Sequence, residues 1–132
     1  MPGVPAVYYG SEWGIAGKKS DGDDALRPAL ETPERNSLTG TIAKMAEAHK
    51  KSRALCCGSY RNVVLTNKQI IFERVTDGER VLVAVNADGA PYTAHFDARC
   101  GQAVDLITGK LHDFGGGSEM PPYSAAFWQC ER

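Results

Sequence analysis

Hydrophobic and polar residues alternate along much of the second half of the chain. Short apolar stretches there are separated by Gly, Pro, Asn and Asp, a pattern typical of antiparallel strands. It predicts strands over residues 69–75, 80–86, 92–96, 103–107, 111–114 and 124–130. The sequence Asp77-Gly78-Glu79 indicates a hairpin between the first two. Strands with turns every eight to twelve residues or so indicate an antiparallel β-sandwich or barrel, often with Greek-key connections.

The first 54 residues follow another pattern. The short apolar run bounded by Pro5 and Gly10 predicts a buried strand, and the polar stretch 15–28 predicts a long loop. From residue 32 the period becomes helical, and Thr39 or Thr41 is expected to cap the helix. The apolar face of that helix holds Ile42, Met45, Ala46 and His49, with His49 expected to be a partly buried helix residue. We therefore expect one βα unit over residues 1–54 and an all-β domain over residues 55–132.

Length, charge and cysteine spacing exclude several classes. The chain has 132 residues, whereas a complete (β/α)8 barrel needs roughly 250. With 15 basic and 16 acidic residues and no charged run, nucleic acid is not an expected partner. No stretch of about 18 consecutive apolar residues occurs, so no membrane-spanning helix is expected.

The four cysteines have no C-x-x-C spacing, which argues against a zinc site or a thioredoxin-like motif. We expect them to be reduced, buried small residues. They are Cys56, Cys57, Cys100 and Cys130.

The opening stretch contains Gly-x-Pro-x-x-Tyr-Tyr-Gly-x-Glu, which resembles a motif of the alpha-amylase superfamily of glycoside hydrolases. Further similar segments follow in the family's order: Leu55-x-x-Gly58-x-Tyr60, Phe72-x-Arg74, Val81–Asn86 and Asp105–Gly109. The resemblance implies the C-terminal portion of such an enzyme: the last barrel strand, a loop, the last helix and the β-sandwich called domain C. The signature residues, expected to be structural, are Gly3, Pro5, Tyr8, Tyr9, Gly10 and Glu12.

The resemblance also implies a function for the parent protein, a retaining enzyme acting on α-glucans such as starch and maltodextrin. The catalytic carboxylates of the family lie on earlier barrel strands, so no catalytic residue is expected in this chain, which alone should be inactive. Its expected partners are the rest of the barrel and, in the parent, α-glucan, with self-association as a further possibility. No cofactor or metal is expected here, since any calcium bound by the family would lie outside this region. The compartment, cytoplasmic or secreted, stays open.

Three residues are candidates for substrate binding. Asp23 and Arg27 resemble an Asp-x-x-x-Arg pair that approaches the sugar in one branch of the family, although Asp24 stands where proline is usual. Trp13 is expected either to stack on a glucose ring or to shield the loop from solvent. For Asp23 and Arg27 the alternative is a solvated surface ion pair.

The remaining aromatic residues allow a different function. Tyr8 and Tyr9 are expected to pack within the barrel, with a role as sugar platforms as the alternative. A sandwich that binds glucan by itself would need several exposed, coplanar rings. The candidates are Tyr60, Phe72, Tyr92, Phe96, Phe114, Tyr123, Phe127 and Trp128.

Overall fold

The computed structural model describes residues 3 and 6–130 and divides the chain into two compact units. One unit is Gly3–Ala46, and the other begins at Glu47. Helix α2 (Ser37–Lys51) runs through the boundary between them. Each unit has its own network of hydrogen bonds and is described separately.

The N-terminal unit is mostly irregular. It contains two 3-10 turns, η1 (Ser11–Trp13) and η2 (Lys19–Asp21), and the short helix α1 (Asp23–Leu26). The strand predicted between Pro5 and Gly10 is wrong for residues 6–9, which form no strand. A strand needs a neighbour to complete its ladder hydrogen bonds, and the described part of the chain gives this segment none. Val4 and Pro5 lie outside the described residues.

Helix α2 lies within the region predicted to be helical from residue 32, but it starts at Ser37 and its cap differs from the prediction. The backbone N–H of Thr39 donates to Asn36 Oδ1 at 3.0 Å, and the N–H of Asn36 donates to Thr39 Oγ1 at 3.3 Å. These reciprocal bonds are the arrangement of a capping box, with Asn36 in the capping position instead of Thr39 or Thr41. Thr39 thus accepts the reciprocal hydrogen bond of the capping box instead of occupying the capping position itself.

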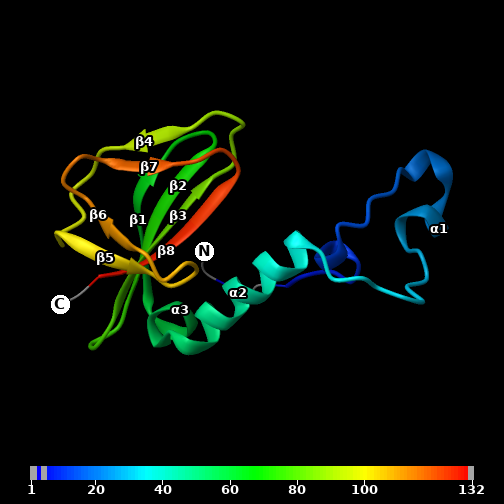
Figure 1. Ribbon diagram of the computed structural model, residues 1–132, viewed down its shortest axis with the longest axis horizontal. Coiled ribbons are helices and arrows are strands. Elements are labelled where there is room, and N and C mark those ends of the chain that lie inside the picture. The colour runs from blue at the N-terminus through cyan, green and yellow to red at the C-terminus, as the bar shows by residue number, and fades with distance from the viewer. Residues whose placement is uncertain (1–2, 4–5, 131–132) are drawn as a thin grey trace. The chain divides into compact units, whose positions relative to one another are not determined.

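The second unit is an antiparallel β-sandwich, which confirms the predicted fold class (Figure 1). Helix α3 (Arg53–Cys57) precedes it, and Ser52 Oγ caps this helix by accepting from Leu55 N. Eight strands follow: β1 (Ser59–Leu65), β2 (Gln69–Val75), β3 (Arg80–Asn86), β4 (Tyr92–Ala94), β5 (Gln102–Asp105), β6 (Leu111–Asp113), β7 (Ser118–Met120) and β8 (Ser124–Cys130).

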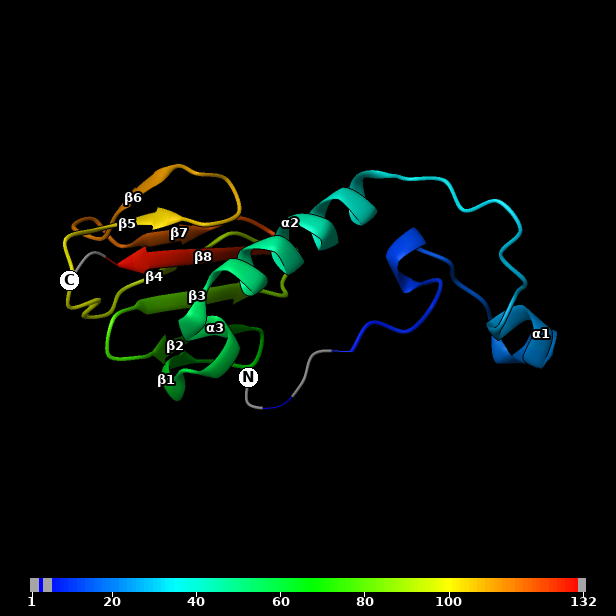
Figure 2. The same cartoon turned by 90° about the horizontal axis from the view of Figure 1, so that it is seen from below.

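The strands form two sheets. The larger sheet has the order β1-β2-β3-β8-β5-β6, and the smaller pairs β4 with β7. Figures 1 and 2 both show β8 in the middle of the large sheet, between β3 and β5. The chain leaves the large sheet after β3, forms β4, and returns later, so strands distant in sequence become neighbours.

The large sheet buries side chains on both faces, and β3 shows why. Leu82 and Ala84 belong to the core between the sheets, while Val81 and Val83 alternate with them onto the opposite face. That opposite face is packed against Ala54 and Leu55 of α3 together with residues of the neighbouring strands. A strand covered on both faces requires a continuous apolar run, which Val81–Val85 provides.

A buried carboxylate lies at one end of the core between the sheets. Arg61 Nε donates to Glu73 Oε1 at 2.5 Å, and Arg80 Nε donates to Glu73 Oε2 at 3.0 Å. The hydrogen bond from Arg61, joined by Arg80, lowers the pKa of Glu73 against the opposing effect of burial. The carboxylate therefore stays ionised in the folded sandwich at neutral pH.

The cysteines only partly match the expectation of burial. Cys130 is buried and Cys100 half-buried, but Cys56 and Cys57 are exposed. The last two lie on α3. Their thiols donate to the backbone carbonyls of His49 (3.1 Å) and Arg53 (3.2 Å), respectively.

Among the described residues, no helix is both long and apolar enough to span a bilayer.

Candidate functional site

The signature motif ends in a tight turn built around Gly10. Gly10 adopts a φ of 87°, a left-handed conformation that favours glycine. Its carbonyl accepts hydrogen bonds from Trp13 N (3.2 Å) and Ile15 N (3.0 Å). The end of the motif, Tyr-Tyr-Gly-x-Glu, therefore forms a folded turn here, with Ser11–Trp13 in η1.

This turn is attached to the start of α2. Asn36 Nδ2 donates to the carbonyl of Trp13 at 2.9 Å, and Thr39 Oγ1 donates to the carbonyl of Glu12 at 2.8 Å. The two residues that cap α2 thus also position the signature turn. Sequence analysis did not identify this role, although Asn immediately before a helical segment is a favoured N-cap residue.

Glu12 has a half-buried side chain with one unpaired oxygen. Its Oε2 is buried and accepts no hydrogen bond from the residues that the structure describes. A buried carboxylate oxygen without a donor is costly, and native structures usually supply one. The arrangement suits a carboxylate whose donor comes from another segment.

Tyr8 and Tyr9 line an open hollow in the N-terminal unit. Their ring centroids are 4.8 Å apart with the planes tilted by 47°, and both side chains are exposed. The hollow has a volume of ≈ 300 Å³, and Leu26 and Pro28 also line it. Trp13 does not line it. The hollow therefore presents two aromatic side chains beside apolar ones.

The three substrate-binding candidates are not brought together. Asp23 and Arg27 are both exposed, at the start of α1 and directly after its end, and they form no ion pair with each other. Trp13 is half-buried at the end of η1. Their contact with sugar stays a prediction.

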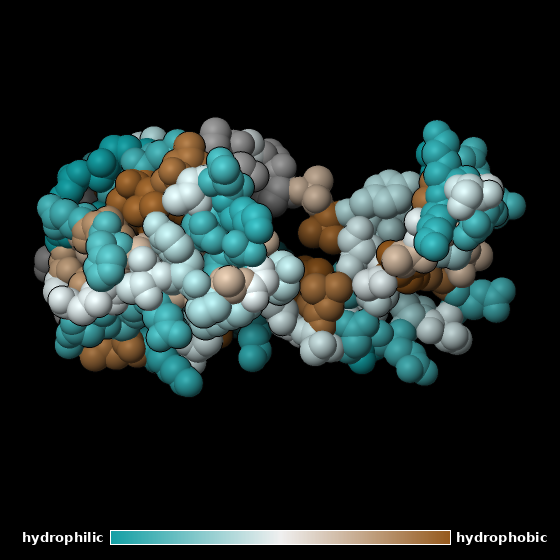
Figure 3. Space-filling view, turned by 90° about the horizontal axis from the view of Figure 1, so that it is seen from above, coloured by the Kyte–Doolittle hydropathy of each residue, from teal (hydrophilic) through white to brown (hydrophobic). Residues whose placement is uncertain are grey.

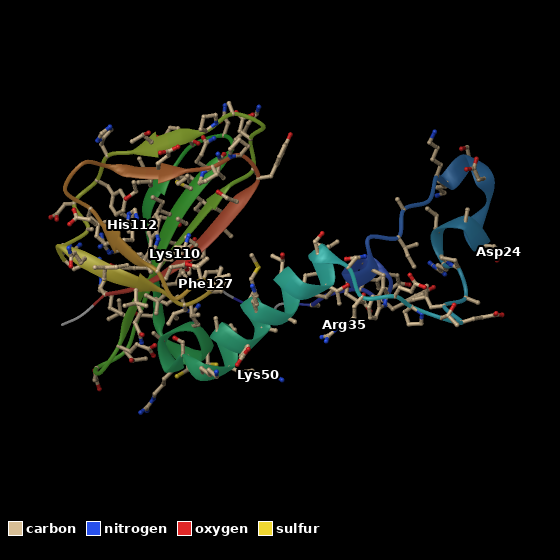
Figure 4. All side chains as sticks on the ribbon, in the orientation of Figure 1. Asp24, Arg35, Lys50, Lys110, His112 and Phe127 are labelled. Atoms are coloured by element: carbon tan, nitrogen blue, oxygen red, sulfur yellow. The ribbon has the colours of Figure 1, made fainter. Side chains whose placement is uncertain are left out.

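The aromatic residues of the sandwich are mostly packed inside it. His112 stacks on Trp128 with ring centroids 4.2 Å apart, and Phe114 meets Trp128 edge-on at 5.5 Å. Figure 4 shows His112 among the side chains that fill the space between the sheets. Burial lowers the pKa of His112, so the stacked ring is neutral at neutral pH.

Tyr123 is the one exposed ring among the eight aromatic residues of the sandwich considered as glucan-binding candidates, all of which the structure describes. Its surface is 78% accessible. The sandwich face seen in Figure 3 is mainly hydrophilic, with hydrophobic residues in separate patches. One exposed ring is not the row of coplanar rings that a glucan-binding module needs.

The described residues contain no group of three or more His, Cys, Asp or Glu side chains arranged to hold a metal ion. The acidic residues instead make local hydrogen bonds. Asp105 is an example: it accepts from Phe127 N at 3.0 Å and from Thr108 Oγ1 at 2.5 Å, which ties the Asp105–Gly109 turn to β8. This segment, one of those similar to domain C, is a structural turn.

Comparison with known proteins finds cyclomaltodextrin glucanotransferases among the relatives of this chain. No protein-family model matches the chain. A cyclomaltodextrin glucanotransferase from Bacillus sp. (strain 38-2) is 33% identical over 116 residues, which is 87% of this chain. The match spans only 15% of that relative's length.

Solved structures share the fold. CldA, described as a cyclomaltodextrin glucanotransferase with a three-domain ABC distribution, superposes with a TM-score of 0.78 at 23% identity. It covers 98% of this chain, and this chain covers 30% of it. An Anoxybacillus alpha-amylase superposes with a TM-score of 0.77 at 20% identity, over 93% of this chain and 28% of its own.

Proposed function

We propose that this chain, a member of the alpha-amylase superfamily of glycoside hydrolases, forms the C-terminal part of an enzyme. That enzyme cleaves or transfers α-glucosidic bonds. The observation that supports this most is the 33% identity to a cyclomaltodextrin glucanotransferase over 87% of the chain. The substrate of the parent would be an α-glucan such as starch or maltodextrin, attacked by the retaining two-carboxylate mechanism.

Within that enzyme we assign this chain a structural role. Residues 1–54 would complete the catalytic barrel and residues 55–132 would form the sandwich packed on it. Two features of the N-terminal unit support this assignment. Residues 6–9 have no partner strand among the described residues, and Glu12 Oε2 has no donor there. A neighbouring barrel strand would supply ladder hydrogen bonds, and a donor from the barrel would pair the carboxylate.

Activity assays test the structural role. The chain alone should release no reducing sugar from maltodextrin or pullulan, because the catalytic carboxylates are expected on other strands. Release of reducing sugar by the purified chain would refute this. The parent itself is tested by the coding sequence upstream of Met1, which should contain an Asn-His-Asp motif after a seventh barrel strand.

Substrate contact is proposed for Trp13, Asp23 and Arg27. If they touch sugar in the complete enzyme, Asp23→Asn or Arg27→Lys should raise KM for maltooligosaccharides and leave the free energy of unfolding unchanged, because both side chains are exposed. Lys18→Gln, an exposed change in the same loop, is the matched control. Equal KM values for all three variants would remove Asp23 and Arg27 from the binding site.

A further inference from the structure

Two cysteines far apart in sequence meet at the end of β8, against the core of the sandwich. The sulfur atoms of Cys100 and Cys130, 30 residues apart in the chain, lie 2.7 Å from each other. Cys100 lies in the connection from β4 to β5, and Cys130 is the last residue of β8. We propose that Cys100 and Cys130 are a redox modification site, at which an intramolecular disulfide forms when the protein meets an oxidised small-molecule disulfide.

The backbone on both sides of this pair is held in place. Cys130 pairs with Arg80 of β3 and with Ala103 of β5, so hydrogen-bonded strands flank it. On the other side, Asp97 Oδ1 accepts from Arg99 N at 2.9 Å, which shapes the turn immediately before Cys100. Closing the sulfur atoms to the bond length of about 2.05 Å needs a shift of only about 0.7 Å, within the reach of side-chain rotation.

The order of the chemical steps follows from exposure. Burial raises the pKa of the Cys130 thiol to about 12, so this thiol seldom ionises by itself. Cys100 is less buried and therefore attacks first. Its thiolate displaces one thiolate from an oxidised low-molecular-weight disulfide and becomes a mixed disulfide.

Cys130 completes the exchange. Its sulfur loses a proton and attacks Cys100 Sγ, which expels the second small thiolate. Arg80 Nη1 lies 3.6 Å from Cys130 Sγ, so a guanidinium is in place to stabilise the thiolate as it forms. In sum, two protein thiols and one small disulfide yield one protein disulfide and two small thiols.

The other two cysteines provide an internal comparison. Cys56 and Cys57 are adjacent on α3 and exposed, so they report ordinary surface reactivity. The variant Cys56→Ser/Cys57→Ser retains only the proposed pair. Adding Cys100→Ser to it gives the matched control, in which the pair is broken.

The experiment oxidises the full chain with oxidised glutathione, alkylates the remaining thiols after denaturation, and maps the peptides by mass spectrometry. In Cys56→Ser/Cys57→Ser we expect no alkylation, a mass lower by about 2 Da for the two hydrogens lost, and a peptide that joins Cys100 to Cys130. We also expect Tm to rise by on the order of 10 °C and to return on reduction.

The same peptide should appear in the unmutated chain, which needs no substitution and so cannot fail by misfolding. The control with Cys100→Ser should keep Cys130 reduced and unlinked. Persistent alkylation of both thiols, a stable glutathione adduct on Cys100, or cross-links confined to Cys56 and Cys57 would overturn the proposal.

Discussion

Asn86 is the most connected buried polar side chain of the sandwich, with 1% of its surface exposed. Its Nδ2 shares its two hydrogens among the carbonyls of Ala90 (2.9 Å), Met120 (3.1 Å) and Pro121 (3.0 Å). Its Oδ1 accepts from Gln69 Nε2 at 2.9 Å and from Asp88 N at 3.0 Å. One amide thus joins β2, β3, the turn after β3 and the turn before β8.

Substitution of Asn86 by Ala should destabilise the sandwich strongly. Each hydrogen bond contributes about 0.5–1.5 kcal/mol net, and each partner left buried without a bond costs about 1–3 kcal/mol. Water will satisfy some of the partners, since the turns lie at the surface. We therefore expect the free energy of unfolding to fall by about 4 kcal/mol, out of the roughly 5–15 kcal/mol typical of a domain.

The measurement is urea unfolding followed by Trp128 fluorescence in a Trp13→Phe background, with far-UV circular dichroism as a second probe. Trp128 is buried between the sheets, so its emission should report loss of the sandwich core. Asn67→Ala is the matched control, because Asn67 is exposed in the β1–β2 turn. A loss below about 1 kcal/mol for Asn86→Ala, or an equal loss for Asn67→Ala, would refute the reasoning.

Three further changes test other features. The hydrogen bond from Arg61 lowers the pKa of Glu73, so the stability that this carboxylate contributes is complete above about pH 4.3 and is lost as the pH falls through its lowered pKa in the folded state. Glu73→Gln should therefore make the free energy of unfolding depend less on pH in acid. An unchanged dependence on acid pH would contradict this. Gly58→Ala places a Cβ 2.5 Å from the Ala54 carbonyl oxygen and should lower the free energy of unfolding, measured by thermal unfolding, by about 2 kcal/mol. Gly78→Ala places its Cβ in open space and should leave the free energy of unfolding unchanged. Arg99 is exposed and has a φ of 53°, so Arg99→Gly should raise the free energy of unfolding, measured by calorimetry, by up to about 1 kcal/mol. A decrease of more than about 1 kcal/mol would show instead that the arginine side chain stabilises the turn.

Three of the strands predicted from alternation have the predicted bounds: 69–75, 80–86 and 124–130. These segments combine β-branched or aromatic residues with clear turn residues at their ends, so local pattern and tertiary pairing agree. Strand β1 was not predicted, because its sequence does not alternate regularly between apolar and polar residues. It is an edge strand with an irregularity between Asn62 and Val64. Strand β7 has three residues and exists through its pairing with β4.

The N-terminal unit shows where local pattern fails for another reason. The apolar run up to Gly10 has the composition of a strand, but no described neighbour pairs with residues 6–9. Similarly, Asp23 and Arg27 have the spacing of one helical turn, but α1 ends at Leu26, so Arg27 lies beyond it. Spacing along the sequence identifies candidate site residues. Whether their side chains come into contact depends on where helices and strands end and what they pack against, which the local sequence does not specify.

The place of β8 in the large sheet has a consequence for how fast the sandwich forms. Strands β1, β2 and β3 are joined by short turns and pair locally, whereas Arg80 of β3 meets Cys130 of β8 from 50 residues away. Such non-local pairing slows folding, because the loop between the strands must lose its entropy first. Until β8 docks, the apolar strand β3 presents an unpaired edge, which is the feature of folding intermediates most prone to aggregate. We therefore expect yield on refolding to depend on protein concentration, with the docking of β8 as the step that competes with aggregation.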